Sequence, residues 1–135
     1  MSFPDFKAKL TLEASVSPSE DPALVGAAMK NVLGGNPEEP TQDRSSLKLA
    51  TDDDKGLVRI RDALRDRHVR SAARRQLLLN TSGDSASLML NRQAAAAGVI
   101  AICGSPEESP LGPIYLTIES ARLQEMVDWL TAYEG

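Results

Sequence analysis

The chain has 135 residues, of which 41% are hydrophobic and 25% charged, and its formal net charge is −4. This length suits one domain, and the composition is ordinary for a globular protein. No apolar run approaches the ~20 residues of a membrane-spanning helix and the N-terminus lacks a signal-peptide core, so we expect a cytoplasmic protein. One cysteine, Cys103, and one histidine, His68, exclude an intramolecular disulfide and the usual Cys/His zinc sites.

The first part of the chain predicts a strand followed by a helix. Apolar and polar residues alternate from Phe6 to Val16, a pattern typical of an antiparallel strand with one buried face. Asp21 suits the N-cap of a helix that has Pro22 at its first position and ends at Gly34. The apolar residues of this helix repeat at helical spacing and predict a buried stripe of Leu24, Ala28, Val32 and Leu33.

A loop and a short strand follow that helix. Residues 36–46 contain two prolines and almost no apolar side chain, so we expect a loop that is too short to link two domains. Leu47 and Leu49 flank a lysine and predict a short second strand. The acidic run from Thr51 to Asp54 favours the start of a helix, because carboxylates stabilise helix N-termini.

The stretch Leu57–Leu79 is strongly basic within an acidic chain. Its seven arginines and two aspartates give it a charge of +5, so the rest of the chain, at a total of −4, carries −9. An apolar stripe formed by Leu57, Ile60 and Leu64 comes first. A second stripe follows, and it is rotated by roughly 160° from the first when the helix is drawn continuously. It consists of Val69, Ala72, Ala73 and Leu77. One straight helix cannot bury both stripes against one sheet, so we predict a break at residues 66–68.

The following segment predicts two strands separated by a helical turn. Thr81–Asp84 has the composition of a turn, and Ala86–Leu90 alternates as a strand. The tetra-alanine run Ala94–Ala97 favours one helical turn before a strand at Val99–Cys103. Gly104–Pro113 holds three prolines and two glycines and predicts a loop of restricted shape.

The end of the chain predicts a last strand and a last helix. Ile114, Leu116 and Ile118 alternate with polar residues, and Ser120 suits the cap of the helix that follows. The buried stripe of this helix is expected to be Leu123, Met126, Val127 and Leu130. Together the elements indicate a single α+β domain over residues 1–135, with an antiparallel or mixed sheet of about five strands and helices packed on one face.

The second half resembles a known family. LNRQAAAAG (90–98), EESPLGPIYLTI (107–118) and the closing VDWL (127–130) are similar to the LNKQAAFVG, ESPLGPI and IDWL segments of a small archaeal family of uncharacterised, predicted RNA-binding proteins. The resemblance implies a fold like the ribosomal large-subunit protein that binds five-S rRNA, and implies RNA binding by analogy of fold. The chain departs from the family at Ala96 and Ala97, where bulky apolar residues are usual.

The arginines are the candidate functional residues, and two interpretations of them stay open. In the first, guanidinium groups contact RNA phosphates; the candidates are Arg67, Arg70, Arg74, Arg75 and Arg92. In the second, the arginines are good helix formers that pair with neighbouring aspartates. The acidic total charge and the scarcity of aromatic side chains for base stacking count against nucleic acid.

Other polar residues favour structural roles. Asn91 and Gln93 could read bases, but side chains at a strand-to-helix corner more commonly satisfy backbone groups. Ser109–Ile114 is expected to fix a turn, because its prolines remove donors that an anion would need. His68 is expected to be structural and Cys103 buried and inert.

Two further sets complete the candidates. Asp52, Asp53 and Asp54 favour helix capping over cation binding, because consecutive acids do not converge on one ion. Trp129 and Tyr133 are expected to anchor the core or an interface.

The sequence therefore predicts a non-enzymatic RNA-binding module that uses its arginines and needs no cofactor and no metal. The alternative is a protein-interaction or self-assembling module, such as a homodimer, in which the acidic body of one copy meets the basic helix of another. No paired carboxylates or nucleophile–base motif supports an enzyme.

Overall fold

The computed structural model describes residues 6–34, 39–52, 54–66 and 68–132. The regular elements, in chain order, are β1 (Lys9–Ser15), α1 (Pro22–Leu33), β2 (Thr41–Asp43), β3 (Ser46–Thr51), α2 (Asp54–Asp66), α3 (Arg70–Leu79), β4 (Ser85–Leu90), α4 (Arg92–Ala96), the 3₁₀-helix η1 (Pro106–Glu108), β5 (Ile114–Glu119) and α5 (Leu123–Leu130). Arg67 and Tyr133, two of the candidates above, lie outside the described residues, and so does Asp53.

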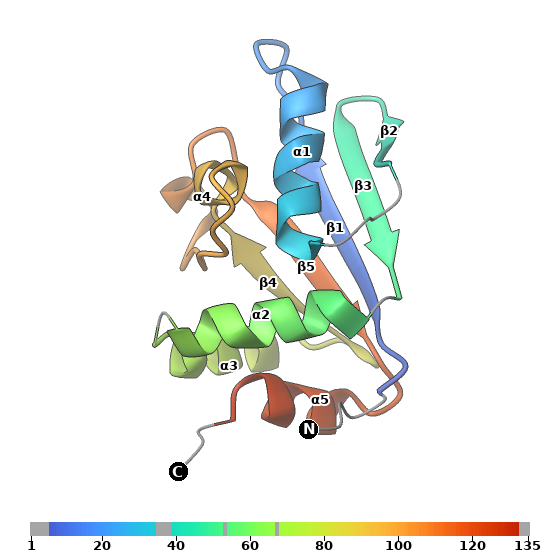
Figure 1. Cartoon of the computed structure of the whole chain (residues 1–135), viewed down its shortest axis with the longest axis vertical. Coiled ribbons are helices and arrows are strands. Elements are labelled where there is room, and N and C mark those ends of the chain that lie inside the picture. The colour runs from blue at the N-terminus through green and yellow to red at the C-terminus, as the bar shows by residue number, and fades with distance from the viewer. Residues whose placement is uncertain (1–5, 35–38, 53, 67, 133–135) are drawn as a thin grey trace.

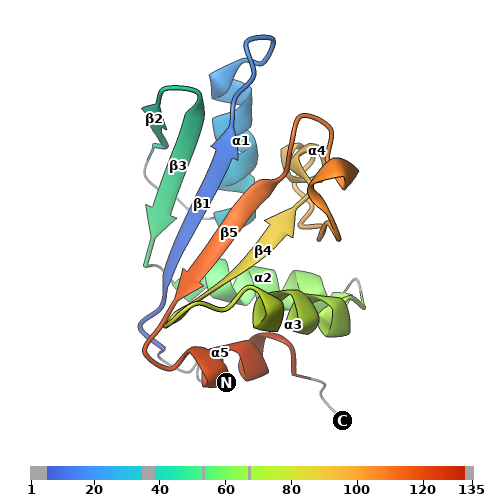
Figure 2. The same cartoon turned by 180° about the vertical axis from the view of Figure 1, so that it is seen from behind.

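The strands form one antiparallel sheet in the order β2-β3-β1-β5-β4. Figures 1 and 2 show the sheet from its two sides, with the helices gathered on one face and the other face open. Alternation explains this arrangement, because β1 buries every second residue and exposes the polar ones between them. The predicted α+β class with one covered face is confirmed.

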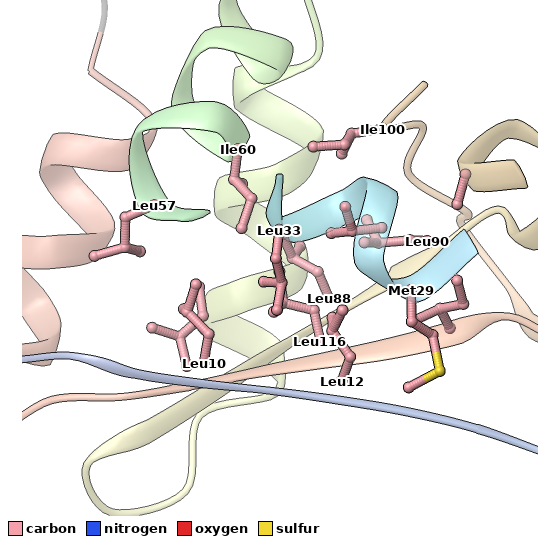
Figure 3. Packing of buried hydrophobic residues seen from close by; sticks show 14 of the residues in the cluster. Leu10, Leu12, Met29, Leu33, Leu57, Ile60, Leu88, Leu90, Ile100 and Leu116 are labelled. Atoms are coloured by element: carbon pink, nitrogen blue, oxygen red, sulfur yellow. The ribbon is translucent and has the colours of Figure 1, made fainter. Parts of the chain in front are cut away.

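The core lies between the sheet and the helices. Leu10 and Leu12 of β1 and Leu116 of β5 point toward Leu33 of α1 and Ile60 of α2, and each of these side chains is at most 2% exposed (Figure 3). Side chains from the first and second halves of the chain therefore share one core, which buries apolar surface that neither half could bury alone.

The predicted break in the arginine-rich stretch is confirmed. Helix α2 ends at Asp66, α3 begins at Arg70, and His68 between them has a φ of 56°. The amide of Val69 donates to Leu64 O (3.1 Å) and that of His68 to Arg65 O (3.2 Å). This is the hydrogen-bond pattern of a Schellman motif, and His68 holds the left-handed position that glycine usually takes.

The predicted strand at Val99–Cys103 is wrong. Instead of a strand, an isolated bridge joins Ile102 to Leu90 of β4, with hydrogen bonds from the Asn91 amide to Ala101 O (2.8 Å) and from the Cys103 amide to Met89 O (2.9 Å) on either side of it. The amide of Val99 donates back to Ala94 O (2.8 Å), which ties the segment to α4. The fifth strand is instead β2, inside the predicted loop, where Gln42 and its neighbours pair with the start of β3.

Smaller differences concern the helices. Leu24 is 69% exposed, because the buried stripe of α1 runs through Val25 and Met29 and joins the predicted Ala28, Val32 and Leu33. Ala72 of α3 is exposed. Ser120 precedes α5 rather than capping it: its hydroxyl accepts the Arg122 amide and donates to Phe6 O, and Arg122 holds the N-cap position.

Candidate interaction surface

Three arginines of the basic stretch bind the end of helix α5. Arg61 of α2 donates from Nε to Trp129 O (3.1 Å). From α3, Arg70 donates to Ala132 O (3.0 Å) and Arg74 donates to Asp128 (2.6 Å) and to the Thr131 hydroxyl (3.4 Å). We call Arg61, Arg70 and Arg74 the α5 clamp.

The physical reason for the α5 clamp is the chemistry of a helix C-terminus. The last carbonyl groups of a helix have no partner inside the helix, and the helix dipole is negative there. Cationic donors satisfy both needs. The Arg61 guanidinium also lies 4.8 Å from the centre of the Trp129 ring, where a cation is attracted to the aromatic face. The hydrogen bond from Arg74 lowers the pKa of the Asp128 carboxyl.

Two other arginines of the stretch have partners within α1 and α2. Arg59 donates to Asn31 O of α1 (2.8 Å). Arg65 lies 3.2 Å from the Asp62 carboxylate and 3.8 Å from that of Asp66. Much of the positive charge of the basic stretch thus interacts with groups of its own chain.

Arg92 is placed differently from the other candidates. Its side chain is 6% exposed and donates to both carboxylate oxygens of Glu20 at 2.8 Å, while Glu20 is 10% exposed. Two of its nitrogens, Nε and Nη2, are buried without a hydrogen-bond partner among the described residues. Since no phosphate can reach a guanidinium enclosed in this way, we leave Arg92 out of the candidate surface.

The acid of this pair is held ionised. Burial raises the pKa of Glu20, but hydrogen bonds from the Ser17 amide and from Arg92, together with the Arg92 charge, outweigh burial and lower the pKa below its ordinary value of 4.5. The pair joins the turn before α1 to the start of α4, two segments separated by 72 positions.

Arg75 is the candidate that faces solvent. It is exposed and has no hydrogen bond or ion pair within the part of the chain that the structure describes. Leu79, one turn further along α3, is 78% exposed, and Leu78 is 45% exposed. We call Arg75, Leu78 and Leu79 the α3 ridge.

Hollows flank the α3 ridge on two sides. The larger has a volume of about 570 Å³, and we call it the α3 groove; it is lined by Val69, Ala72, Arg75, Gln76, Leu79, Asn80, Met89, Ile102 and Gly104. The second, of about 420 Å³, is lined by Ser71, Arg74, Arg75, Leu78 and Leu79. The α3 groove lies between α3, the edge of β4 and the segment after α4.

Gln76 lines the α3 groove and connects two of its sides. Its side-chain amide accepts the Met89 amide of β4 (2.6 Å) and donates to Cys103 O (2.8 Å). A side-chain amide offers the same donor and acceptor as a peptide group, so Gln76 links the Met89 amide to the Cys103 carbonyl as a peptide group could. Residues 101–103 lie beside β4, where the Asn91 amide donates to Ala101 O and the Cys103 amide donates to Met89 O, and Gln76 bridges Met89 and Cys103 at the end of this contact.

The remaining candidates have structural partners. Asn91 caps α4 by accepting the Ala94 amide (2.8 Å). Ser109 accepts the Arg92 amide and donates to Gly112 O, so that it fixes the turn of the Pro110–Pro113 segment. Cys103 is buried, and burial raises the pKa of its thiol. The structural interpretation of these residues therefore agrees with their contacts.

Two features are absent from the described parts of the chain. No group of three or more His, Cys, Asp or Glu side chains converges there in a way that could hold a metal ion. None of the helices described there is long and apolar enough to cross a membrane.

The chain is similar to several archaeal proteins, although no family model matches it. A UPF0201 protein of Sulfurisphaera tokodaii is 37% identical over 125 residues, which cover 91% of this chain and 86% of that protein. A UPF0201 protein of Metallosphaera sedula is 32% identical over 123 residues, covering 90% and 86%.

Solved structures share the fold. The crystal structure of a UPF0201 protein from Methanococcus jannaschii has a TM-score of 0.76 and 19% identity, and the match covers 94% of this chain and 95% of that one. A DUF54 protein of Methanothermobacter thermautotrophicus has a TM-score of 0.64 and 18% identity, with 91% of each chain covered. The five-stranded sheet and its helices are thus an arrangement that folds in related chains.

Proposed function

This chain belongs to the UPF0201 family of archaeal proteins, and we propose that it is a non-enzymatic module that binds another protein through the α3 ridge and the α3 groove. The observation that carries the proposal is Leu79, a 78% exposed leucine beside an unfilled hollow of about 570 Å³. An exposed apolar side chain next to a groove of this size, rimmed by polar groups, is typical of an interaction site. We also propose that the protein is cytoplasmic, as its sequence predicts.

The contacts of the arginines favour protein over nucleic acid as the partner. The α5 clamp directs Arg61, Arg70 and Arg74 to acceptors on α5. The remaining basic group on the α3 ridge, Arg75, is accompanied by two leucines rather than by aromatic rings. Interfaces between proteins combine apolar anchors with arginine, whereas single-stranded RNA is bound by basic grooves with stacking platforms.

The side chains of the α3 groove support a binding role rather than a catalytic one. Val69, Ile102 and Met89 are apolar, and the polar members are amides and one guanidinium. General acid–base or nucleophilic catalysis needs a carboxylate, imidazole, thiol or activated hydroxyl in the pocket. The groove offers none of these groups.

A photo-crosslinking amino acid at position 79 tests the proposed function. Introduced in place of Leu79 in cells that express the full chain, it should form an adduct with a protein that mass spectrometry identifies. The same group in place of Leu24, which is 69% exposed on α1, is the matched control and should give no such adduct. Equal labelling from both positions, or no protein adduct at position 79, would contradict the proposal.

RNA binding is the second candidate, and the exposure of Arg75 beside the half-exposed Arg74 supports it. The implied likeness to the five-S-rRNA-binding ribosomal protein adds an analogy of fold without a site. Contacts from these two arginines would neutralise roughly two phosphates, which gives a log–log slope of affinity against salt of about −1.5 to −2.

Structured RNA titrated at two salt concentrations tests this candidate. Arg75→Glu should weaken binding at least about tenfold if RNA contacts the α3 ridge, since it replaces an attraction by a repulsion. Lys48→Glu, which reverses an exposed charge on the sheet, is the control and should change affinity much less. Binding that ignores both salt and Arg75→Glu contradicts RNA binding at this surface.

A further inference from the structure

We infer that the α3 ridge and α3 groove bind a second copy of this chain, in a two-fold symmetric dimer in which the ridge of each copy enters the groove of the other. The inference rests on the proposed function and names its partner. In a symmetric dimer the same surface patch serves both copies, so it must be complementary to itself. The α3 surface has this property in both shape and charge.

Shape complementarity comes from the position of Arg75 and Leu79. Both residues line the α3 groove and also the hollow on the other flank of the helix. They therefore form a ridge directly beside a groove on one helix. A helix–helix contact packs ridges into grooves, and a two-fold axis near α3 would let each Leu79 fill the partner's groove.

Charge complementarity comes from the two ends of the α3 groove. Arg75 lies on its α3 side without a partner among the described residues. At the opposite boundary lies Gly104, and the Glu108 carboxylate approaches it so closely that a Cβ on Gly104 would lie 2.7 Å from Oε2. Glu108 is exposed. The patch thus carries a cation, Arg75, and an anion, Glu108, that are separate from each other. A two-fold axis between them places Arg75 of each copy opposite Glu108 of the other.

The charges at the α3 groove favour a second copy of the chain over RNA or a membrane surface as the bound partner. An RNA or an anionic membrane surface would meet Glu108 as a like charge at the groove boundary, which costs affinity. A second copy meets both charges with its own. The apolar lining, with Val69, Met89 and Ile102, supplies the dry centre that a stable interface needs around the inserted leucine.

Sedimentation equilibrium over a range of chain concentrations tests the inference. The wild-type chain should dimerise, and Leu79→Lys should raise the dissociation constant at least about tenfold, because a buried apolar anchor is replaced by a charge. Leu24→Lys changes a leucine of similar exposure on α1 and should leave the constant unchanged. Circular dichroism and thermal unfolding establish that the variants are folded.

A charge exchange gives the sharper test. Arg75→Glu and Glu108→Arg should each weaken the dimer about tenfold, since each places like charges across the interface. The double variant restores the opposite charges and should recover most of the affinity. Two folded single variants that dimerise as the wild type does, or a double variant no better than the singles, would overturn the assigned geometry.

The outcomes separate this inference from the proposed function. A wild-type chain that stays monomeric, together with an adduct of position 79 to a different protein, overturns self-association and leaves the interaction module standing. A monomeric chain that yields no adduct at position 79 overturns both. Dimerisation that Leu79→Lys does not affect overturns the inference, since the interface then lies elsewhere.

Discussion

At the residue scale, the buried pair of Arg92 and Glu20 has the largest predicted effect on stability. Arg92→Met leaves the Glu20 carboxylate buried without its cation, and loss of one partner of such a pair costs about 3–5 kcal/mol in free energy of unfolding. Glu20→Leu combined with Arg92→Met should recover most of this loss, because two apolar side chains need no charge compensation. Urea unfolding of both variants measures the difference.

The exposed pair of Lys48 and Glu13 is the matched control. Lys48 Nζ lies 3.7 Å from Glu13 Oε2, and the side chains of Lys48 and Glu13 are 61% and 53% exposed. Lys48→Met should change the free energy of unfolding by less than about 1 kcal/mol, because solvent screens an exposed pair. A cost for Arg92→Met that is no larger than this would show that the buried pair is not a stabilising element.

The same pair predicts an acid-dependent loss of stability. The pKa of Glu20 is lowered in the folded chain, so its stabilising contribution is present above the unfolded pKa and is lost as the pH falls through the folded value. The free energy of unfolding should therefore decline below about pH 4.5 more steeply in the wild type than in the Glu20→Leu/Arg92→Met variant. Urea titrations at several pH values check this; parallel curves for both chains would contradict it.

His68 predicts a stabilising substitution. A residue with a Cβ at a φ of 56° is strained, and glycine relieves the clash. His68→Gly should raise the free energy of unfolding by about 0.5–1 kcal/mol, while His68→Ala, which keeps the Cβ, should not. A loss of stability in His68→Gly would show that the imidazole makes a stabilising contact that offsets the strain.

At the element scale, the α5 clamp explains why the arginines lie where they do. Arg61→Met, Arg70→Met and Arg74→Met together remove the donors to the end of α5 and should lower the free energy of unfolding by about 2–3 kcal/mol. Amides of α5 should lose hydrogen-exchange protection before those of β1. Arg75→Met is the control and should cost less than about 0.5 kcal/mol.

Because of the α5 clamp, a substitution of Arg70 or Arg74 changes the structure as well as any contact with RNA. A variant that removes Arg70 or Arg74 loosens α5, so any loss of RNA affinity in it has a structural explanation as well. Arg75 can be changed without this side effect. If hydrogen exchange of α5 is the same in the triple variant and the wild type, the clamp is not what holds this helix.

At the scale of the whole molecule, the separation of charge in the sequence is largely resolved inside the fold. The basic stretch meets acceptors on α1, α2 and α5 instead of forming one open basic face. Most of the arginines described in this stretch therefore have their partners within the chain itself. The surface that we propose for a second molecule is the α3 groove, whose lining is largely apolar and which has Arg75 and Glu108 at its boundaries.

The sequence by itself determined the elements whose causes are local. Alternation specified β1, β4 and β5, the residues around Pro22 and Gly34 specified α1, and the rotation of apolar stripes specified the break at His68. These features depend on side-chain period and on turns of a few residues, and both can be read along the chain. The one-sided α+β sheet followed from the same patterns.

Only the tertiary structure decided which distant groups meet. Gln76 of α3 bridges Met89 of β4 and Cys103, and Arg92 meets Glu20, 72 positions away, instead of solvent. An arginine has the same helix propensity whether it faces a carbonyl, a carboxylate or water, so no local pattern could separate Arg75 from Arg70. The sheet order and the docking of α5 separate them, because those long-range contacts set which guanidinium groups lie against acceptors and which remain in water.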